Sequence, residues 1–188
     1  NSISFSDLLC SAQIVKLRAR IAKEGNPQHL SNIVWSFAKL EYKSQDLFAA
    51  VAGEHKRIAR DGKVQEVSNI AWALAKMKYK CDEFYEAVAG EHERIAKEGN
   101  SQDLSNTCWA LATAGHKAED LFRKVAIERL KITGGGDLQH MSNIVWAFAT
   151  SGAADGAEAE ELFKAVAGQN KRIVADGSSQ HLTNTLWR

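Results

Sequence analysis

The sequence has little of what defines several common protein classes. Its 188 residues contain one proline and three cysteines, and no apolar run approaches the roughly 18 residues of a membrane span. Cys10, Cys81 and Cys108 lie far apart and form no CxxC pair, so neither a disulfide framework nor a zinc site is expected. The net charge is +1, so no overall field draws the chain to nucleic acid or to a membrane. We therefore expect a globular protein with structural cysteines and no membrane insertion.

Patterns that carry catalysis are also missing. We find no nucleophile beside a base, no carboxylate pair and no metal-ligating cluster. The glycine run Gly134-Gly135-Gly136 follows no strand and precedes no Lys-Ser/Thr, so it does not indicate a phosphate-binding loop. We therefore expect no enzyme activity, no cofactor, no metal and no small-molecule substrate.

One repeated phrase dominates what the sequence does contain. Gln-x-x-Ser/Thr-Asn-x-x-Trp occurs five times and holds every tryptophan of the chain, namely Trp35, Trp72, Trp109, Trp146 and Trp187. Successive tryptophans are 37, 37, 37 and 41 residues apart. A fixed period of about 20–50 residues is typical of units that stack on one another. The sequence therefore predicts an all-α fold, an α-solenoid of about four to five stacked helix-turn-helix repeats with a period of about 37 residues.

The repeats divide the chain as a single array over residues 1–188. It comprises a partial repeat at 1–25, repeats at 26–62, 63–99, 100–136 and 137–177, and a partial repeat at 178–188. In the first full repeat, Asn26 and Pro27 predict the start of a helix A over about 27–41. A single helix B follows and ends at Gly62 as a left-handed cap, a role predicted also for Gly99. Because both chain ends interrupt a repeat, we expect a piece of a longer protein.

Two interpretations fit the invariant residues of the phrase. Gln, Asn and Trp lie on one stripe of helix A, where they either contact extended nucleotides or hold neighbouring repeats together. We assign the asparagines and tryptophans to the structural core of the repeats: Asn32, Trp35, Asn69, Trp72, Asn106, Trp109, Asn143, Trp146, Asn184 and Trp187. The glutamines are candidate RNA base contacts: Gln28, Gln65, Gln102 and Gln139.

The residue after each glutamine varies between copies. It is His29, Glu66, Asp103, His140 and His181 in turn. Modular binders read one ligand unit per repeat with such variable side chains, so this column is a second set of candidate base contacts. The alternative is that this position lies in an exposed first turn where the residue type varies without a functional role, with acidic residues favoured by the helix dipole.

A column of cations recurs near the end of each helix B. Its members are Arg20, Arg57, Arg94, Lys131 and Arg172. One cation per repeat suits contacts to a phosphate backbone. The alternative is local pairing, because Glu54, Glu91 and Glu128 lie three residues before Arg57, Arg94 and Lys131.

The segments Gln65–Lys76 (QEVSNIAWALAK) and Gln102–Thr113 (QDLSNTCWALAT) resemble the core of octotricopeptide repeats. The resemblance covers nearly the whole chain. It implies an α-solenoid that binds single-stranded RNA in a chloroplast or mitochondrion, although this chain contains no targeting segment.

The leading hypothesis is therefore an RNA-binding helical-repeat protein of an organelle, acting in organellar RNA metabolism or translation. The alternative is a protein-interaction scaffold, such as a peripheral subunit of an organellar ribosome or another large complex. Its near-zero net charge and the paired Glu/Arg columns favour the scaffold.

Overall fold

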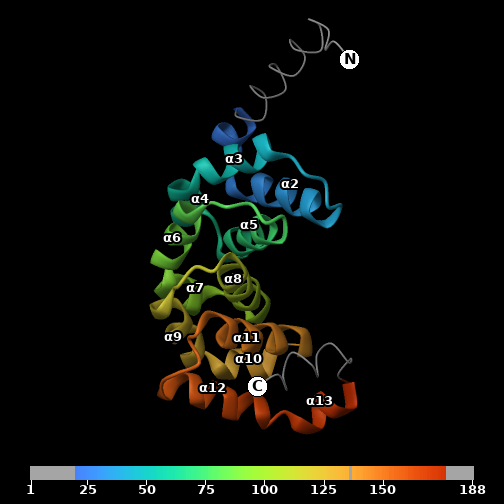
Figure 1. Cartoon of the computed structure of the whole chain (residues 1–188), viewed down its shortest axis with the longest axis vertical. Helices are drawn as coiled ribbons and strands as arrows, with labels where there is room; N and C mark the ends of the chain where they lie inside the picture. The colour runs from blue at the N-terminus through green and yellow to red at the C-terminus, as the bar shows by residue number, and fades with distance from the viewer. Residues whose placement is uncertain (1–19, 136, 177–188) are drawn as a thin grey trace, which may run out of the picture.

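The computed structural model describes residues 20–135 and 137–176, and within those ranges it contains helices, turns and loops but no strand. This confirms the predicted all-α class for the described residues. After a helical segment at 20–24, the helices are α2 (Pro27–Lys39), α3 (Gln45–Gly53), α4 (His55–Asp61), α5 (Val64–Lys76), α6 (Asp82–Gly90), α7 (His92–Glu98), α8 (Ser101–Ala114), α9 (Glu119–Ile127), α10 (Arg129–Gly135), α11 (Leu138–Ser151), α12 (Ala157–Ala167) and α13 (Asn170–Asp176). Figure 1 shows them following one another in chain order along the long axis of the molecule.

The helices that carry the repeated phrase are α2, α5, α8 and α11. The side chain of Asn26 accepts a hydrogen bond from the backbone N–H of His29, and Pro27 occupies the first helical position, so the predicted start of α2 is confirmed. Leu30 and Val34 are fully buried, as their spacing on one helix face predicts. Leu40, which the spacing of the apolar residues in this helix also predicts on that face, lies just after the last residue of α2 and is 79% exposed.

The predicted single helix B is wrong, because each copy is split into two helices. In the first full repeat, α3 ends at Gly53 and α4 begins at His55, with Glu54 at φ −90° and ψ 18° between them. The backbone N–H of Glu54 bonds three residues back, to the carbonyl of Val51, which tightens the last turn. Glycine alone does not explain the break, since Ile127 takes the place of Gly53 where α9 ends.

The predicted left-handed caps at Gly62 and Gly99 are also wrong. Gly62 has φ −74° and ψ 143°, an extended conformation open to any residue. Space is the reason for glycine here, because a Cβ on Gly62 would lie 2.7 Å from the carbonyl oxygen of Ile58. A left-handed backbone occurs instead after the phrase helices, at φ 72° in Gly115 and φ 53° in Glu41.

The phrase helices pack in sequence, α2 on α5, α5 on α8 and α8 on α11. A second series of contacts joins α4 to α6, α7 to α9 and α10 to α12. Fully buried aromatic rings fill the space between the two series, and Phe122 and Phe148 meet edge to face with centroids 4.9 Å apart. None of the described helices combines the length and the apolar character that crossing a membrane requires.

Candidate functional site

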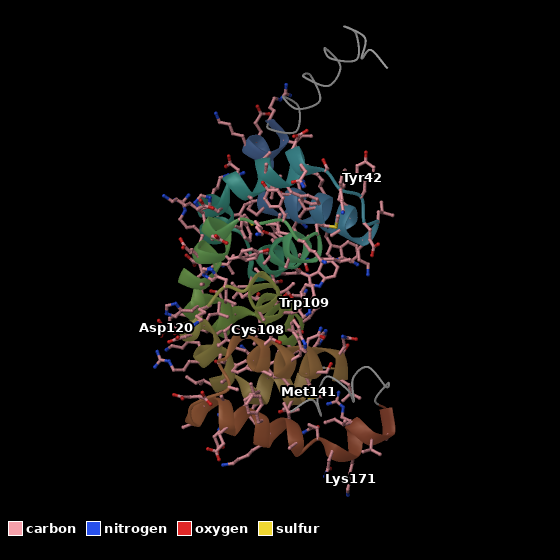
Figure 2. The ribbon with its side chains drawn as sticks, viewed as in Figure 1. Tyr42, Cys108, Trp109, Asp120, Met141 and Lys171 are labelled. Atoms are coloured by element: carbon pink, nitrogen blue, oxygen red, sulfur yellow. The ribbon has the colours of Figure 1, made fainter. Side chains whose placement is uncertain are left out.

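The repeated Gln, Asn and Trp residues occupy one face of each of the four phrase helices, together with a lysine or threonine one turn after each Trp. We call this surface the amide–indole stripe; its members are Gln28, Asn32, Trp35, Lys39, Gln65, Asn69, Trp72, Lys76, Gln102, Asn106, Trp109, Thr113, Gln139, Asn143, Trp146 and Thr150. Figure 2 shows Trp109 on the opposite side of the molecule from Asp120, which lies on α9. Trp109 therefore lies on the side away from α9, the helix that follows its phrase.

The indole rings line up from one helix to the next. The ring centroids of Trp72 and Trp109 are 6.3 Å apart with an interplanar angle of 38°, and those of Trp109 and Trp146 are 6.4 Å apart at 32°. The three rings are half-buried and pack against the core, whereas Trp35 is 42% exposed. Lys39 lies with its Nζ 5.4 Å from the ring centroid of Trp35, a cation–π contact. The row of rings thus combines packing between helices with an exposed aromatic edge.

The amide side chains form a parallel row beside the indoles. Asn106 donates from Nδ2 to the Oδ1 of Asn69 at 3.4 Å, across the contact between α8 and α5. Gln139 donates from Nε2 to the Oδ1 of Asn143 at 3.0 Å. Asn69, Asn106 and Asn143 are half-buried, but Asn32, predicted as core, lies on the surface. Among the described elements, α2 packs against a phrase helix on one side only, which leaves Asn32 and Trp35 uncovered.

The glutamines of the first three copies extend to solvent. Gln28, Gln65 and Gln102 are exposed, and Gln139 is half-buried. They keep amide donors and acceptors at the surface, next to the ring row. Of the two predicted sets of base contacts, this is the one in which three of the four described members are exposed.

The variable column after each glutamine does not form one surface. His29 is exposed, but Glu66 turns back to accept a hydrogen bond from the backbone N–H of Lys63 at 2.9 Å. His140 lies with its Nδ1 3.3 Å from the hydroxyl of Ser101. His181, the last member of the column, lies outside the described residues.

Asp103, the third member of that column, is buried with 5% of its surface exposed. Its carboxylate accepts hydrogen bonds from the backbone N–H of Asn100 and from the hydroxyl of Ser68 on the preceding phrase helix, at 3.1 and 3.3 Å. Burial raises the pKa of Asp103, against the opposing effect of those hydrogen bonds. Asp103 therefore joins α8 to α5 and presents no group to a ligand in this structure.

The cation column lies between successive repeats. Arg57 donates from Nε to Glu54 at 2.9 Å, from Nη1 to the carbonyl of Gly25 at 3.0 Å and from Nη2 to the carbonyl of Ala22 at 2.6 Å. Gly25 and Ala22 belong to the end of the preceding helix, whose last carbonyls lack partners within that helix. We call this arrangement the carbonyl clamp.

The carbonyl clamp recurs along the described chain. Arg94 bonds Glu91 and the carbonyls of Gly62 and Ala59. Lys131 donates to the carbonyls of Ala96 and Lys97 at 2.9 and 3.0 Å and pairs with Glu128. Arg172 donates to the carbonyl of Thr133 at 3.3 Å. Arg20, by contrast, is exposed and pairs with Glu24 at 3.1 Å.

The local Glu–Arg pairing offered as an alternative is therefore present, at 2.9 Å for both Arg57 and Arg94. The interaction that the sequence did not show is the bond to carbonyls 32 and 35 residues earlier in the chain. That separation is close to the 37-residue spacing of the phrase. The period of the repeat was therefore the only sign in the sequence that these residues meet.

Chemistry at the remaining candidates is limited. Within residues 20–135 and 137–176 no group of three or more His, Cys, Asp or Glu side chains is placed to hold a metal ion. Burial raises the pKa of Cys81 to about 12 and also raises the pKa of Cys108, so both thiols stay protonated at neutral pH. Cys10 lies outside the described residues.

No protein-family model matches the chain, and no curated protein matches it significantly.

Proposed function

We propose that this protein is an α-solenoid of helical-hairpin repeats with a period of about 37 residues and that it binds single-stranded RNA along the amide–indole stripe. The observation that carries the proposal is the row of half-buried indoles, 6.3 and 6.4 Å apart, beside exposed glutamines. Aromatic faces and edges accept bases of any sequence, and amides hydrogen-bond the edges of unpaired bases. An invariant stripe therefore favours sequence-tolerant binding.

The RNA contacts proposed here therefore differ from those predicted from the sequence. Bases would lie against the glutamines and indoles rather than against Asp103, whose carboxylate is occupied within the fold. Phosphates would meet the lysines at the ends of the phrase helices, Lys39 and Lys76, because the clamp engages Arg57 and Arg94. The resemblance to octotricopeptide repeats supports an organellar site of action, in a chloroplast or mitochondrion, and a role in RNA metabolism or translation.

Intrinsic fluorescence offers a direct test, since every tryptophan of the chain belongs to the repeated phrase. An unstructured oligouridylate is titrated into the protein, and quenching of the indole emission is measured together with the anisotropy of a labelled strand. The double variant Gln65→Ala/Gln102→Ala should weaken binding at least fivefold, with an unchanged melting curve. Gln169→Ala, in the turn between α12 and α13, is the matched control. Unquenched emission at saturating strand concentration would refute the proposal.

A protein scaffold is the second candidate. It is favoured by the clamp, which turns cations from the surface toward backbone carbonyls, and by exposed apolar side chains such as Leu40 and Leu130. Purification of the full-length protein from its organelle separates the two. A scaffold would keep its partner proteins after ribonuclease treatment, whereas an RNA binder would lose them.

A further inference from the structure

A pocket of about 480 Å³ lies where the loop after α2 meets the loop after α5. Its size falls within the range of about 300–1,000 Å³ that small-molecule sites occupy. None of the base or phosphate contacts predicted from the sequence lines it, although Lys76, proposed above as a phosphate contact, does. The pocket therefore represents a feature of the fold that the repeat pattern did not indicate.

Cations dominate the rim of this pocket. Lys43, Lys76 and Lys78 line it, against one lining carboxylate, Glu41, whose Oε1 is 3.6 Å from the Nζ of Lys76. Lys43 and Lys78 are exposed at their tips and can reorient toward a ligand. The excess of positive charge favours an anion.

The wall of the pocket includes the start of α3 (Gln45–Gly53). Ser44 precedes that helix and is 4% exposed, and its hydroxyl oxygen is buried without a hydrogen-bond partner. Buried hydroxyls in proteins normally have a partner, and rotation of the Ser44 side chain toward the pocket would let a ligand oxygen supply one. The first-turn N–H groups of α3 receive no bond from the Ser44 side chain, and their end of the helix dipole is positive.

Two aromatic rings complete the pocket. Phe48 and Tyr79 line it with their centroids 6.1 Å apart. Lys76 links the pocket to the amide–indole stripe, because its Nζ also lies 5.4 Å from the ring centroid of Trp72. An anion bearing a nucleoside therefore fits the chemistry better than a simple ion.

The corresponding place two repeats later has the opposite charge. A pocket of about 530 Å³ lies between the loops after α8 and α11, and Lys117 and Arg123 are its lining cations. Its lining carboxylates are Glu119, Asp120, Asp155 and Glu158. Ala118 takes the place of Ser44 before α9. The features that favour an anion thus belong to the first pocket and not to the second.

We propose that the pocket between the loops after α2 and α5 binds a phosphate group of RNA, through Lys43, Lys78 and the Ser44 hydroxyl. Tyr79, which is half-buried, lies beside the attached nucleoside with the buried Phe48 behind it, and Lys76 directs the strand toward Trp72. RNA as the source of the phosphate rests on the proposed function. The phosphate is either a terminal 5′-monoester or an internal diester of the strand.

The anion site is tested first with inorganic phosphate, which does not depend on the amide–indole stripe. In a titration of the 15N-labelled protein, we expect the amide signals of Ser44, Gln45 and Asp46 to shift. The double variant Lys43→Gln/Lys78→Gln should weaken the phosphate affinity at least tenfold, and Ser44→Ala at least threefold. Lys78 has a left-handed backbone, with φ 54°, so its replacement should differ from lysine as little as possible. Glutamine is chosen because it has a similar unbranched side chain and no charge.

The control carries the same change of charge elsewhere. Lys117→Gln/Lys171→Gln removes two exposed lysines outside the first pocket and should bind phosphate as the wild type does. An equal loss in this control, or no shift at residues 44–46, would overturn the proposal, because phosphate would then bind through general charge or not at all.

The source of the phosphate is tested with two oligouridylates, one with a 5′-phosphate and one with a 5′-hydroxyl. A terminal site predicts at least fivefold tighter binding of the phosphorylated strand, lost in Lys43→Gln/Lys78→Gln. An internal site predicts equal binding of both strands and an equal loss for both in that variant. Wild-type binding of both strands by the variant would reject the pocket as an RNA site. Phosphate shifts without binding of either strand would reject RNA as the source, together with the proposed function.

Discussion

Arg94 donates a hydrogen bond from Nη1 to the carbonyl oxygen of Gly62, 32 residues earlier in the chain, at 2.9 Å. The same guanidinium donates from Nε to Glu91 at 2.9 Å, so its charge is balanced on its own helix while its donors reach the preceding repeat. Helix ends leave carbonyls that need outside partners, and Arg94 supplies one from the next unit. The basic column is thus a device that joins repeats.

Removal of this joint should lower stability. Arg94→Ala leaves half-buried carbonyls and Glu91 without their donor, and we expect the free energy of unfolding to fall by about 2 kcal/mol. Arg60→Ala, which removes an exposed arginine paired with Asp61, should leave the free energy of unfolding nearly unchanged, because solvent screens that pair. Urea denaturation followed by circular dichroism measures both. Unchanged stability in Arg94→Ala with weakened RNA binding would restore the phosphate-contact hypothesis.

Glycine at position 62 is required for space, so substitution there should be costly. A Cβ on Gly62 would lie 2.7 Å from the carbonyl oxygen of Ile58 and 3.1 Å from Cγ2 of Val67. We expect Gly62→Ala to destabilise the protein by more than about 1 kcal/mol. Gly53→Ala meets nothing within 4 Å and replaces a helical glycine, so it should stabilise by about 0.5 kcal/mol. Equal effects of the two changes would contradict the steric explanation.

The burial of Asp103 predicts a pH dependence. Its pKa is raised in the folded state, so the contribution of this group to stability is complete below the unfolded-state pKa, about 4, and is lost as pH rises through the folded-state pKa. In Asp103→Asn that loss disappears. The free energy of unfolding of the variant, minus that of the wild type, should therefore increase from pH 4 to pH 7. A decrease over this range would mean that the charged hydrogen bonds to Asn100 and Ser68 outweigh burial.

Trp109 in the middle of the indole row and Trp35 at its first position should differ in their effect on stability. Trp109 stacks between Trp72 and Trp146, and Trp109→Ala should cost about 3 kcal/mol by opening a cavity between phrase helices. Trp35→Ala should cost about 1 kcal/mol, because 42% of that side chain is exposed. Chemical denaturation gives both values. A variant that loses little stability at position 35 but binds RNA weakly would assign that ring to the ligand.

The salt dependence of RNA binding distinguishes contacts by the lysines of the stripe and of the first pocket from contacts by the cations of the carbonyl clamp. If Lys39, Lys43, Lys76 and Lys78 contact phosphates, the slope of log affinity against log salt concentration should be roughly −3, at about −0.7 per contact. Lys39→Gln/Lys76→Gln should reduce its magnitude by about 1.4. Arg57→Gln should leave the slope unchanged where a melting curve shows the variant folded. A flat slope in the wild type would exclude phosphate contacts by these lysines.

The starts and buried faces of the phrase helices could be predicted from the sequence because their signals are local, whereas the split of each helix B could not. The cap at Asn26 and the apolar face of Leu30 and Val34 depend on neighbours within one or two turns, and both are present in the structure. The pairing of Arg57 with Glu54 is likewise a contact within one helix turn.

Contacts between repeats could not be predicted from the sequence in the same way. Gly62 looked like a conformational requirement, whereas the side chain of Val67 in the next helix limits the space beside it. Asp103 occupies a position that is exposed in the first repeat, at His29, and buried in the third, where Ser68 bonds it. The lysine-rich pocket had a local signal in Lys43, Lys76 and Lys78, but only the stacking of two hairpins brings the two loops together.

The carbonyl clamp also bears on how a protein of this kind can gain or lose repeat units during evolution. Each unit carries both halves of the joint, an arginine or lysine that donates to carbonyls of the unit before it and terminal carbonyls that accept from the unit after it. A gene segment that encodes one unit can therefore be duplicated or deleted without any redesign of the surfaces that meet. The length of the protein can therefore change in steps of one unit, and if it binds RNA as proposed, so can the length of strand that it covers.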